Sequence, residues 1–286
     1  MAELLLDFLN KEEPPVTYLI GRGILPVAGK CIMAGHPKTN KSFLVINMGL
    51  DLALGRPLFE AFYPNKKPVF PVYKRNKVLF LEQELGSLGV QERMKSIIGA
   101  EGIDPVGLDF YVKTKDMSMR IDTEDGKNAI QAELAQVKPD VVIFDPLSKF
   151  HLADENSAQH MGAIMRRVDR WIQDFGCAVI IIHHQALASL NPEMHRKGGA
   201  KLRGSSAIFA DVDTSIDVIR KSPANHKEPV LQLEFELRRG EPLEPIFLRR
   251  LKTGNVQYLG DRSKKEEVAE EKIAPPTSKK GMYDDL

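Results

Sequence analysis

The sequence contains 286 residues, of which 43% are hydrophobic, and its formal net charge is +1. This length predicts one large domain or two small ones with a sizeable core. The near-neutral charge excludes a global electrostatic attraction to nucleic acid, so contact with DNA or RNA requires a local basic patch. Cys31 and Cys177 lie in apolar runs, which indicates buried thiols rather than a disulfide framework or a metal site.

We recognise no export signal and no apolar run of transmembrane length in the sequence, and we therefore expect a cytoplasmic protein. Residues 1–15 predict a short N-terminal helical segment, and residues 16–28 read as irregular because glycines and prolines interrupt them. A buried strand over 30–34 and a helix over 42–55 follow, with Gly55 as the helix stop.

The residues between this strand and this helix match a phosphate-binding loop. They are Gly35, His36, Pro37, Lys38, Thr39, Asn40, Lys41 and Ser42, close to the pattern Gly, four residues, Gly-Lys-Ser/Thr. In such a loop, backbone N–H groups and the first helical turn form a concave anion site. We expect Lys41 to reach the β- and γ-phosphates of a nucleotide and the Ser42 hydroxyl to hold Mg²⁺.

One position departs from the pattern, because Asn40 stands where the second glycine belongs. Glycine serves there because it has no Cβ and tolerates positive φ, and asparagine is the residue that most readily follows it into the left-handed region. We therefore expect the loop to form. A reduced affinity for nucleotide, or a reduced rate of hydrolysis, is the expected cost of Asn40.

The remaining pattern alternates strands with helices. Residues 56–76 are rich in proline and lysine and predict a loop. Beyond them we predict strands over 77–81, 110–112, 141–144 and 178–182, helices over 90–99, 126–136 and 157–175, a long polar loop over 186–204, a helical turn over 206–211, and alternating strands over 214–220, 230–237 and 246–251. This order predicts an α/β fold whose mainly parallel central sheet is flanked by helices and carries antiparallel edge strands.

Acidic residues follow two of the apolar strands. Asp145 ends the strand over 141–144 and is a candidate to orient Mg²⁺ through water, although an aspartate at a strand end can also cap a helix. Glu82 and Glu84 end the strand over 77–81, and either one is a candidate to polarise an attacking water. Because the carboxyl ends of parallel strands line the ligand crevice, we expect these acids near the phosphate loop.

The strand over 178–182 ends at His183 and His184, which places a polar group at the same edge. Adjacent strand residues point to opposite faces, so we do not expect these two histidines to share a metal ion. The loop after them is basic, with Arg196, Lys197, Lys201 and Arg203. Such a loop is a candidate to contact nucleic-acid phosphates or to supply an arginine to a neighbouring subunit's nucleotide.

Several segments in one order carry a family resemblance. They are the loop Ala34–Ser42, Leu54-Gly55-Arg56-Pro57, Val78–Glu84 with Arg93 downstream, Asp145-Pro146-Leu147, Asp154-Glu155-Asn156, His183-His184, Arg203-Gly204-Ser205-Ser206-Ala207 and Asp213-Thr214. This order resembles the RecA-like P-loop ATPases, most closely the RepA-type hexameric replicative helicase branch, over roughly residues 16–252.

The resemblance implies roles for individual residues. Glu84 corresponds to the catalytic glutamate, Asp145 to the Mg²⁺-associated aspartate, His184 or His183 to the γ-phosphate sensor, and Arg203 to an arginine finger that reaches the adjacent subunit. The segment 186–202, with Arg196, Lys197 and Lys201, corresponds to the loop that touches single-stranded DNA in a central pore. The resemblance further implies ATP and Mg²⁺ as ligands and self-association into a ring, by expectation a hexamer, or a filament.

We therefore divide the chain into an N-terminal helical segment (1–15), a RecA-like ATPase domain (16–260) and a charged tail (261–286). The tail's composition predicts disorder, with a short partner-binding peptide as the functional alternative. The leading functional hypothesis is an oligomeric ATPase that acts on single-stranded DNA. The two rivals are a regulatory or loader ATPase without unwinding activity and a non-hydrolysing nucleotide-binding scaffold.

Overall fold

One mixed sheet forms the centre of the computed structural model, which describes residues 3–12, 15–60, 69–184 and 207–261. The strands are β1 (Tyr18–Ile20), β2 (Leu25–Pro26), β3 (Lys30–Gly35), β4 (Val78–Glu82), β5 (Phe110–Thr114), β6 (Val141–Asp145), β7 (Ala178–His184), β8 (Thr214–Arg220), β9 (Val230–Leu237), β10 (Ile246–Arg250) and β11 (Val256–Asp261). The helices are α1 (Leu5–Asn10), α2 (Lys41–Leu54), α3 (Ser87–Glu101), α4 (Glu124–Val137), α5 (Ala158–Phe175) and α6 (Ala207–Ala210), with a 3-10 turn η1 (Leu147–Lys149).

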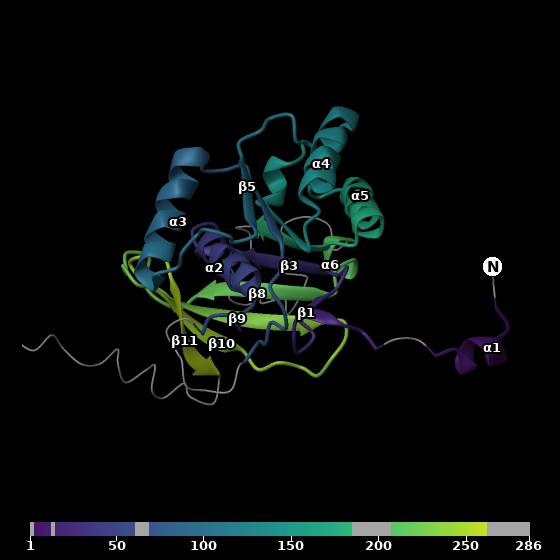
Figure 1. Ribbon diagram of the computed structural model, residues 1–286, viewed down its shortest axis with the longest axis horizontal. Coiled ribbons are helices and arrows are strands. Elements are labelled where there is room, and N and C mark those ends of the chain that lie inside the picture. Colours follow the sequence, from purple (N-terminus) through teal and green to yellow (C-terminus); the bar gives the residue numbers. More distant parts are fainter. Residues whose placement is uncertain (1–2, 13–14, 61–68, 185–206, 262–286) are drawn as a thin grey trace, which may run out of the picture.

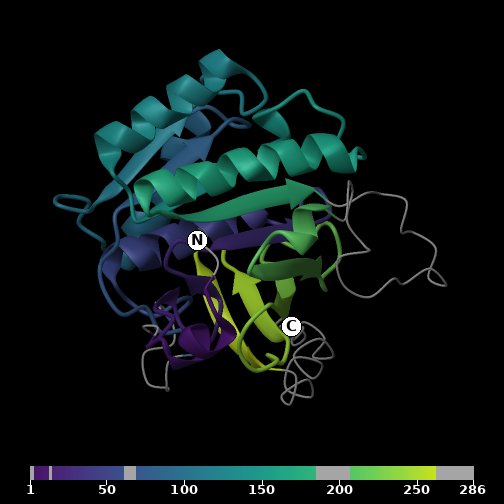
Figure 2. The same ribbon diagram turned by 90° about the vertical axis from the view of Figure 1, so that its right-hand side faces the viewer.

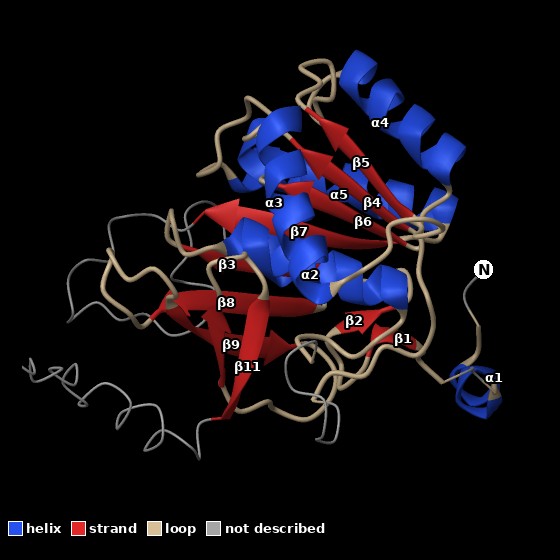
Figure 3. Cartoon of the chain, turned by 60° about the vertical axis from the view of Figure 1, so that its left-hand side comes forward, coloured by secondary structure: helices blue, strands red, loops and turns tan. Residues whose placement is uncertain are grey.

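The nine strands of the sheet lie in the order β11-β10-β9-β8-β3-β7-β6-β4-β5, and Figure 3 shows them as one twisted fan. Neighbouring pairs from β8 to β5 are parallel. The pairs β8–β9, β9–β10 and β10–β11 are antiparallel. This arrangement confirms the predicted mainly parallel sheet with antiparallel strands at one edge.

Helices cover both faces of the parallel part, as Figures 1 and 2 show. Strand side chains alternate between the two faces. Ile143 and Ile180 belong to the core under α2 and α3, whereas Phe144 and Ile181 belong to the core under α4 and α5. In the second core the ring of Phe144 stacks on Trp171 with centroids 6.1 Å apart. The uninterrupted apolar runs of β6 and β7 are therefore explained by burial on both faces.

Helix ends follow the signals in the sequence. The Ser157 side chain accepts the backbone N–H of His160 and caps α5, and Gly176 ends that helix at φ 67°. Gly55 ends α2 at φ 68°, as expected. Immediately after it, the Arg56 guanidinium lies between the carboxylates of Asp51 and Glu101, with N–O distances of 2.5 Å to each. This buried cluster joins the end of α2 to the end of α3.

Four differences from the predicted elements stand out. Residues 16–28 contain the small antiparallel pair β1–β2 rather than irregular chain only. β11 was not predicted; it pairs with β10 after a turn at Gly254. α3 is longer than the predicted 90–99, and α1 occupies only part of 1–15. Elements of two or three residues carry too little periodicity to be recognised in sequence.

Other expectations fall outside the described residues. They are the polar loop over 186–204 and, apart from Asp261 at the end of β11, the tail over 261–286. α1 buries none of its residues and lies apart from the sheet in Figure 1. Over the ranges that the structure describes, none of the helices combines the length and apolarity needed to cross a membrane.

Candidate nucleotide-binding site

The loop between β3 and α2 folds around the side chain of Lys41. The Lys41 ammonium donates to the carbonyl oxygens of Gly35 and His36 at 2.8 and 2.9 Å. The Thr39 hydroxyl also donates to the His36 carbonyl, at 2.8 Å. In a nucleotide complex, phosphate oxygens would replace these carbonyls as partners of the ammonium. The loop therefore closes around its own lysine.

Two non-glycine residues of the loop adopt left-handed backbone conformations. Lys38 has φ 64°, and Asn40, the residue before α2, has φ 66°. Asn40 thus takes the conformation that glycine would adopt in the standard pattern. Its side-chain Nδ2 is buried and has no hydrogen-bond partner among the described residues. At Gly35, by contrast, a Cβ would lie 2.6 Å from the carbonyl oxygen of Val218, so only glycine fits.

A cavity of about 500 Å³ opens at the carboxyl ends of the parallel strands. It is lined by the phosphate loop and by Glu84, Asp145 and His184. The strand register explains this convergence, because Gly35 on β3 pairs with His184 on β7 and Glu82 on β4 pairs with Asp145 on β6. The volume is in the range of small-molecule sites. The structure therefore brings together the predicted site residues that it describes.

The two acids after β4 have different environments. The buried carboxylate of Glu82 accepts the backbone N–H groups of Glu84, Leu85 and Gly86, with distances of 2.8 Å to Glu84 and 3.0 Å to Gly86. Glu84 is exposed and lines the cavity. Glu82 therefore builds the turn, and of the two acids only Glu84 has a carboxylate available to a ligand in the cavity.

Asp145 lies at the bottom of the cavity beside Ser42. Its side chain is 2% exposed, and it accepts a hydrogen bond from the Ser42 hydroxyl. Burial raises the pKa of Asp145 to about 7, a rise that the Ser42 hydrogen bond opposes. One carboxylate oxygen, Oδ1, is buried without a hydrogen-bond partner among the described residues.

These two side chains fit a magnesium site. Mg²⁺ typically binds through one or two protein oxygens together with substrate phosphates and water. A carboxylate oxygen left without a partner next to a hydroxyl, at the mouth of a phosphate loop, provides this donor set. Elsewhere in the described ranges, no cluster of three or more His, Cys, Asp or Glu side chains is placed to hold a metal ion.

The charge of Lys41 is tuned by its surroundings. Burial lowers the pKa of Lys41 to about 8, and the carboxylates of Asp145 and Glu84 oppose this fall. Desolvation removes water from the ammonium, and the carbonyls of Gly35 and His36 together with two nearby acids compensate in part. A bound polyphosphate would add negative charge and favour the ammonium form.

The histidines at the end of β7 point to opposite faces, as the strand period requires. His184 lines the cavity, whereas His183 is fully buried. Burial lowers the pKa of His184 to about 4, with the Lys41 charge as a second cause. Near neutral pH the His184 imidazole is therefore uncharged, and it meets the phosphate end of the cavity as a neutral hydrogen-bonding group.

Four further residues line or frame the cavity. Arg93 of α3 and Arg220 at the end of β8 line it together with Phe43. The guanidinium carbons of Arg93 and Arg250 lie 4.5 and 5.1 Å from the centroid of the Phe43 ring. In the sequence, Arg93 stands out only as part of the family resemblance, and no local pattern marks Phe43, Arg220 or Arg250 as site residues. Their positions depend on tertiary contacts between α2, α3 and the β8–β11 region, which no local spacing reveals.

Four predicted residues lie outside the described part of the chain. They are Arg203, the predicted arginine finger, and Arg196, Lys197 and Lys201, the predicted DNA contacts. Their roles stay predictions.

Comparison with known protein families agrees with this site. A family model described as AAA domain matches residues 1–188 of the 286-residue chain. The match includes the phosphate loop, Glu84, Asp145 and His184. Because it spans more than half of the sequence, the protein belongs to the AAA domain family of P-loop ATPases.

Proposed function

We propose that this protein is an ATP-hydrolysing motor that assembles into a ring and acts on single-stranded DNA, as a RepA-like replicative helicase or a related recombination ATPase. The observation that carries the ATPase part is the convergence of Lys41, Ser42, Glu84 and Asp145 around one cavity at the strand ends. The DNA part rests on the resemblance of the segments between Ala34 and Thr214. The buried free thiols of Cys31 and Cys177 fit a cytoplasmic setting.

In the proposed reaction, water attacks the γ-phosphorus and the bond to the oxygen bridging to the β-phosphate breaks. The Glu84 carboxylate orients the water and draws on its proton. The Lys41 ammonium stabilises the charge that develops on the phosphate oxygens. His184 donates or accepts a hydrogen bond at the γ-phosphate as a neutral imidazole.

Ser42 and Asp145 would hold Mg²⁺, Ser42 directly and Asp145 through water. When bound, this ion would supply positive charge that offsets the negative charge of the nucleotide phosphates. The protein's contribution is to keep the Asp145 carboxylate and the Ser42 hydroxyl in contact before the nucleotide arrives.

Assembly completes the site in this proposal. Arg203 reaches the nucleotide of the adjacent subunit, and Arg196, Lys197 and Lys201 contact DNA phosphates in the pore of a hexamer. A nucleotide held between subunits would couple hydrolysis to movement of the DNA-contacting loop.

An ATPase assay with and without a single-stranded DNA oligonucleotide tests the proposal. The variants are Lys41→Ala and, as a matched control, Lys95→Ala, which removes an exposed lysine of α3 that does not line the cavity. We expect hydrolysis that DNA stimulates in the wild type and in Lys95→Ala, and none in Lys41→Ala.

The rivals give different results. Hydrolysis that DNA does not stimulate would favour a regulatory ATPase, and nucleotide binding without turnover would favour a scaffold. Hydrolysis that survives Lys41→Ala would overturn the site assignment itself. Unwinding of a forked duplex tests the helicase claim, and its absence in an assembled, DNA-stimulated ring would exclude that activity.

A further inference from the structure

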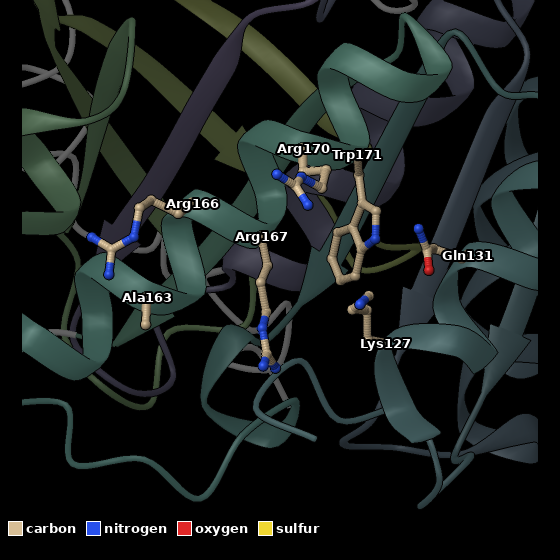
Figure 4. Close-up of a pocket in the computed structure, with 7 residues that line it drawn as sticks. All are labelled: Lys127, Gln131, Ala163, Arg166, Arg167, Arg170 and Trp171. Atoms are coloured by element: carbon tan, nitrogen blue, oxygen red, sulfur yellow. The ribbon is translucent and has the colours of Figure 1, made fainter. Parts of the chain in front are cut away.

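A basic groove lies between α4 and α5, on the face of the sheet away from the phosphate loop. Its cavity measures about 370 Å³ and is lined by Lys127 and Gln131 of α4 and by Ala163, Arg166, Arg167, Arg170 and Trp171 of α5. We call this set the α4–α5 groove. Figure 4 shows the Trp171 ring beside the side chains of Lys127 and Gln131, with Arg166, Arg167 and Arg170 extending from α5.

The groove carries more positive charge than its surroundings neutralise. Glu124 pairs with both Lys127, at 2.8 Å, and Arg167, at 3.3 Å. Arg166 and Arg170 have no ion pair or hydrogen bond to any described residue. Of the two acids of α5, Asp169 pairs with Lys30, and Asp174, four residues after Arg170, forms no ion pair with it. Four cations thus face one carboxylate, which predicts a negatively charged ligand.

The groove also has an apolar component. Trp171 is 2% exposed and stacks against Phe144 in the core, and together with Ala163 it contributes apolar lining to the cavity. Arg166 and Arg170 are four residues apart, so they stand one above the other on the same helix face. A ligand that fits this geometry combines two neighbouring negative charges with an apolar or aromatic group.

One segment of this chain has that composition. Residues 282–286 read Met-Tyr-Asp-Asp-Leu, with two adjacent carboxylates, three apolar or aromatic side chains and no cation. The other acidic pairs beyond β11, Glu266-Glu267 and Glu270-Glu271, have lysines close to them and no aromatic residue. We propose that residues 282–286 bind in the α4–α5 groove of the same molecule, with Asp284 and Asp285 on Arg166 and Arg170.

The chain is long enough for this contact. The sheet of nine strands is roughly 38 Å wide at the usual strand spacing. The twenty residues 262–281 that separate β11 from the segment can reach at most roughly 66 Å, which exceeds this width. Tethering on this scale gives an effective concentration in the millimolar range, so a weak charge-dependent contact is populated.

Energy transfer from Trp171 tests the proposal directly, because it is the single tryptophan of the chain. A dansyl acceptor on Gly281→Cys in the full-length protein reports the distance between the tail and the groove, and Cys31 and Cys177 are buried away from the label. We expect strong transfer in this protein at low salt. Transfer should fall severalfold in Asp284→Lys/Asp285→Lys and in Arg166→Glu/Arg170→Glu, and return when the four changes are combined.

A matched control changes the same charge elsewhere in the tail. Glu270→Lys/Glu271→Lys should leave transfer unchanged, and so should Lys41→Ala, since the contact does not require ATP hydrolysis.

Equal loss in Glu270→Lys/Glu271→Lys, or no recovery in the combined variant, would overturn the proposal. Transfer that disappears on hundredfold dilution would place the segment on a second copy and overturn the intramolecular contact. Binding of a single-stranded oligonucleotide at Arg166 and Arg170 with no tail effect would assign the groove to nucleic acid instead.

Discussion

The carboxylate of Glu82 accepts the backbone N–H of Glu84 at 2.8 Å, so the first acid of the pair fixes the position of the second. Two acids that look equivalent in sequence therefore have separate duties. The Glu82 carboxylate is occupied by hydrogen bonds to the turn between β4 and α3. Glu84 lines the cavity, and its carboxylate is available to a bound ligand. This division leads to the first prediction.

Glu84→Gln is expected to lower the ATP hydrolysis rate by about 10²–10⁴-fold, because it removes the group that orients and deprotonates water. Nucleotide affinity should remain close to that of the wild type, since the phosphate loop is untouched. Steady-state ATPase rates and binding of a fluorescent ATP analogue measure the two effects. A rate within a factor of a few of wild type would remove Glu84 from the proposed mechanism.

Glu82→Gln is the matched comparison. The amide has only one acceptor oxygen and no charge, so it cannot satisfy the N–H groups of Glu84, Leu85 and Gly86 together. We expect a loss of about 1–3 kcal/mol in the free energy of unfolding, measured in urea. If Glu82→Gln unfolds like the wild type yet loses hydrolysis, the duties of the two acids are the reverse of those assigned here.

The parallel core was predictable because its signals are local. The strands β3, β4, β6 and β7 are mainly apolar runs buried on both faces, and α5 shows one continuous apolar stripe from Met161 to Ile172. The sequence did not predict three strands, β1, β2 and β11. These strands are defined by the strands with which they pair, and their amino-acid composition does not distinguish them from loops. β11, for example, follows a turn that Asn255 and Asn47 anchor to α3 and α2.

The sequence predicts those site residues that lie at the ends of the parallel strands or on the phosphate loop. Lys41, Asp145 and His184 stand at strand ends or on the phosphate loop, so parallel topology brings them together. Arg93, Arg220 and Phe43 come from surfaces that meet only in the folded protein. The choice of Glu84 over Glu82 came from the family resemblance, and the hydrogen bonds of Glu82 now supply its physical reason.

Asn40 tests whether the loop tolerates a side chain at its left-handed position. Asn40→Gly keeps φ near 66° accessible and removes a buried amide nitrogen that lacks a partner, so we expect wild-type or higher nucleotide affinity. Asn40→Val forces a β-branched residue into the same conformation at a cost of about 1–2 kcal/mol. This cost corresponds to roughly a 5–30-fold loss of affinity.

Titration of both variants with a fluorescent ATP analogue measures the difference. Unfolding in urea serves as the control, because a loop that only perturbs binding should leave most of the global stability intact. Equal affinity in Asn40→Gly and Asn40→Val would show that the backbone conformation at this position does not control nucleotide binding.

Arg56 is expected to hold the end of α2 against α3. Its guanidinium contacts Asp51 and Glu101, whose side chains are 2% and 4% exposed. Arg56→Met leaves two buried acids without their cation, so we expect a loss of about 3–5 kcal/mol in the free energy of unfolding. Lys74→Met is the control, because the exposed Lys74–Asp140 pair should contribute only about 0–1 kcal/mol. Similar losses in the two variants would contradict a special role for the Arg56 cluster.

The pH dependence of nucleotide binding should report the titration of Lys41. Its pKa is lowered to about 8 by burial, so the ammonium is complete below pH 7 and is lost as the pH rises through 8. Binding of polyphosphate requires the charged form, and above pH 8 each molecule must take up a proton first. We expect ATP affinity to be constant between pH 7 and about 7.5 and then to fall, approaching tenfold per pH unit.

Lys41→Arg keeps its charge throughout this range, so its affinity, although weaker, should not decline between pH 8 and 9.5. Isothermal titration in buffers of different ionisation enthalpy measures both the affinity and the proton uptake. A wild-type affinity that stays constant to pH 9.5 would show that Lys41 retains an ordinary pKa in the free site.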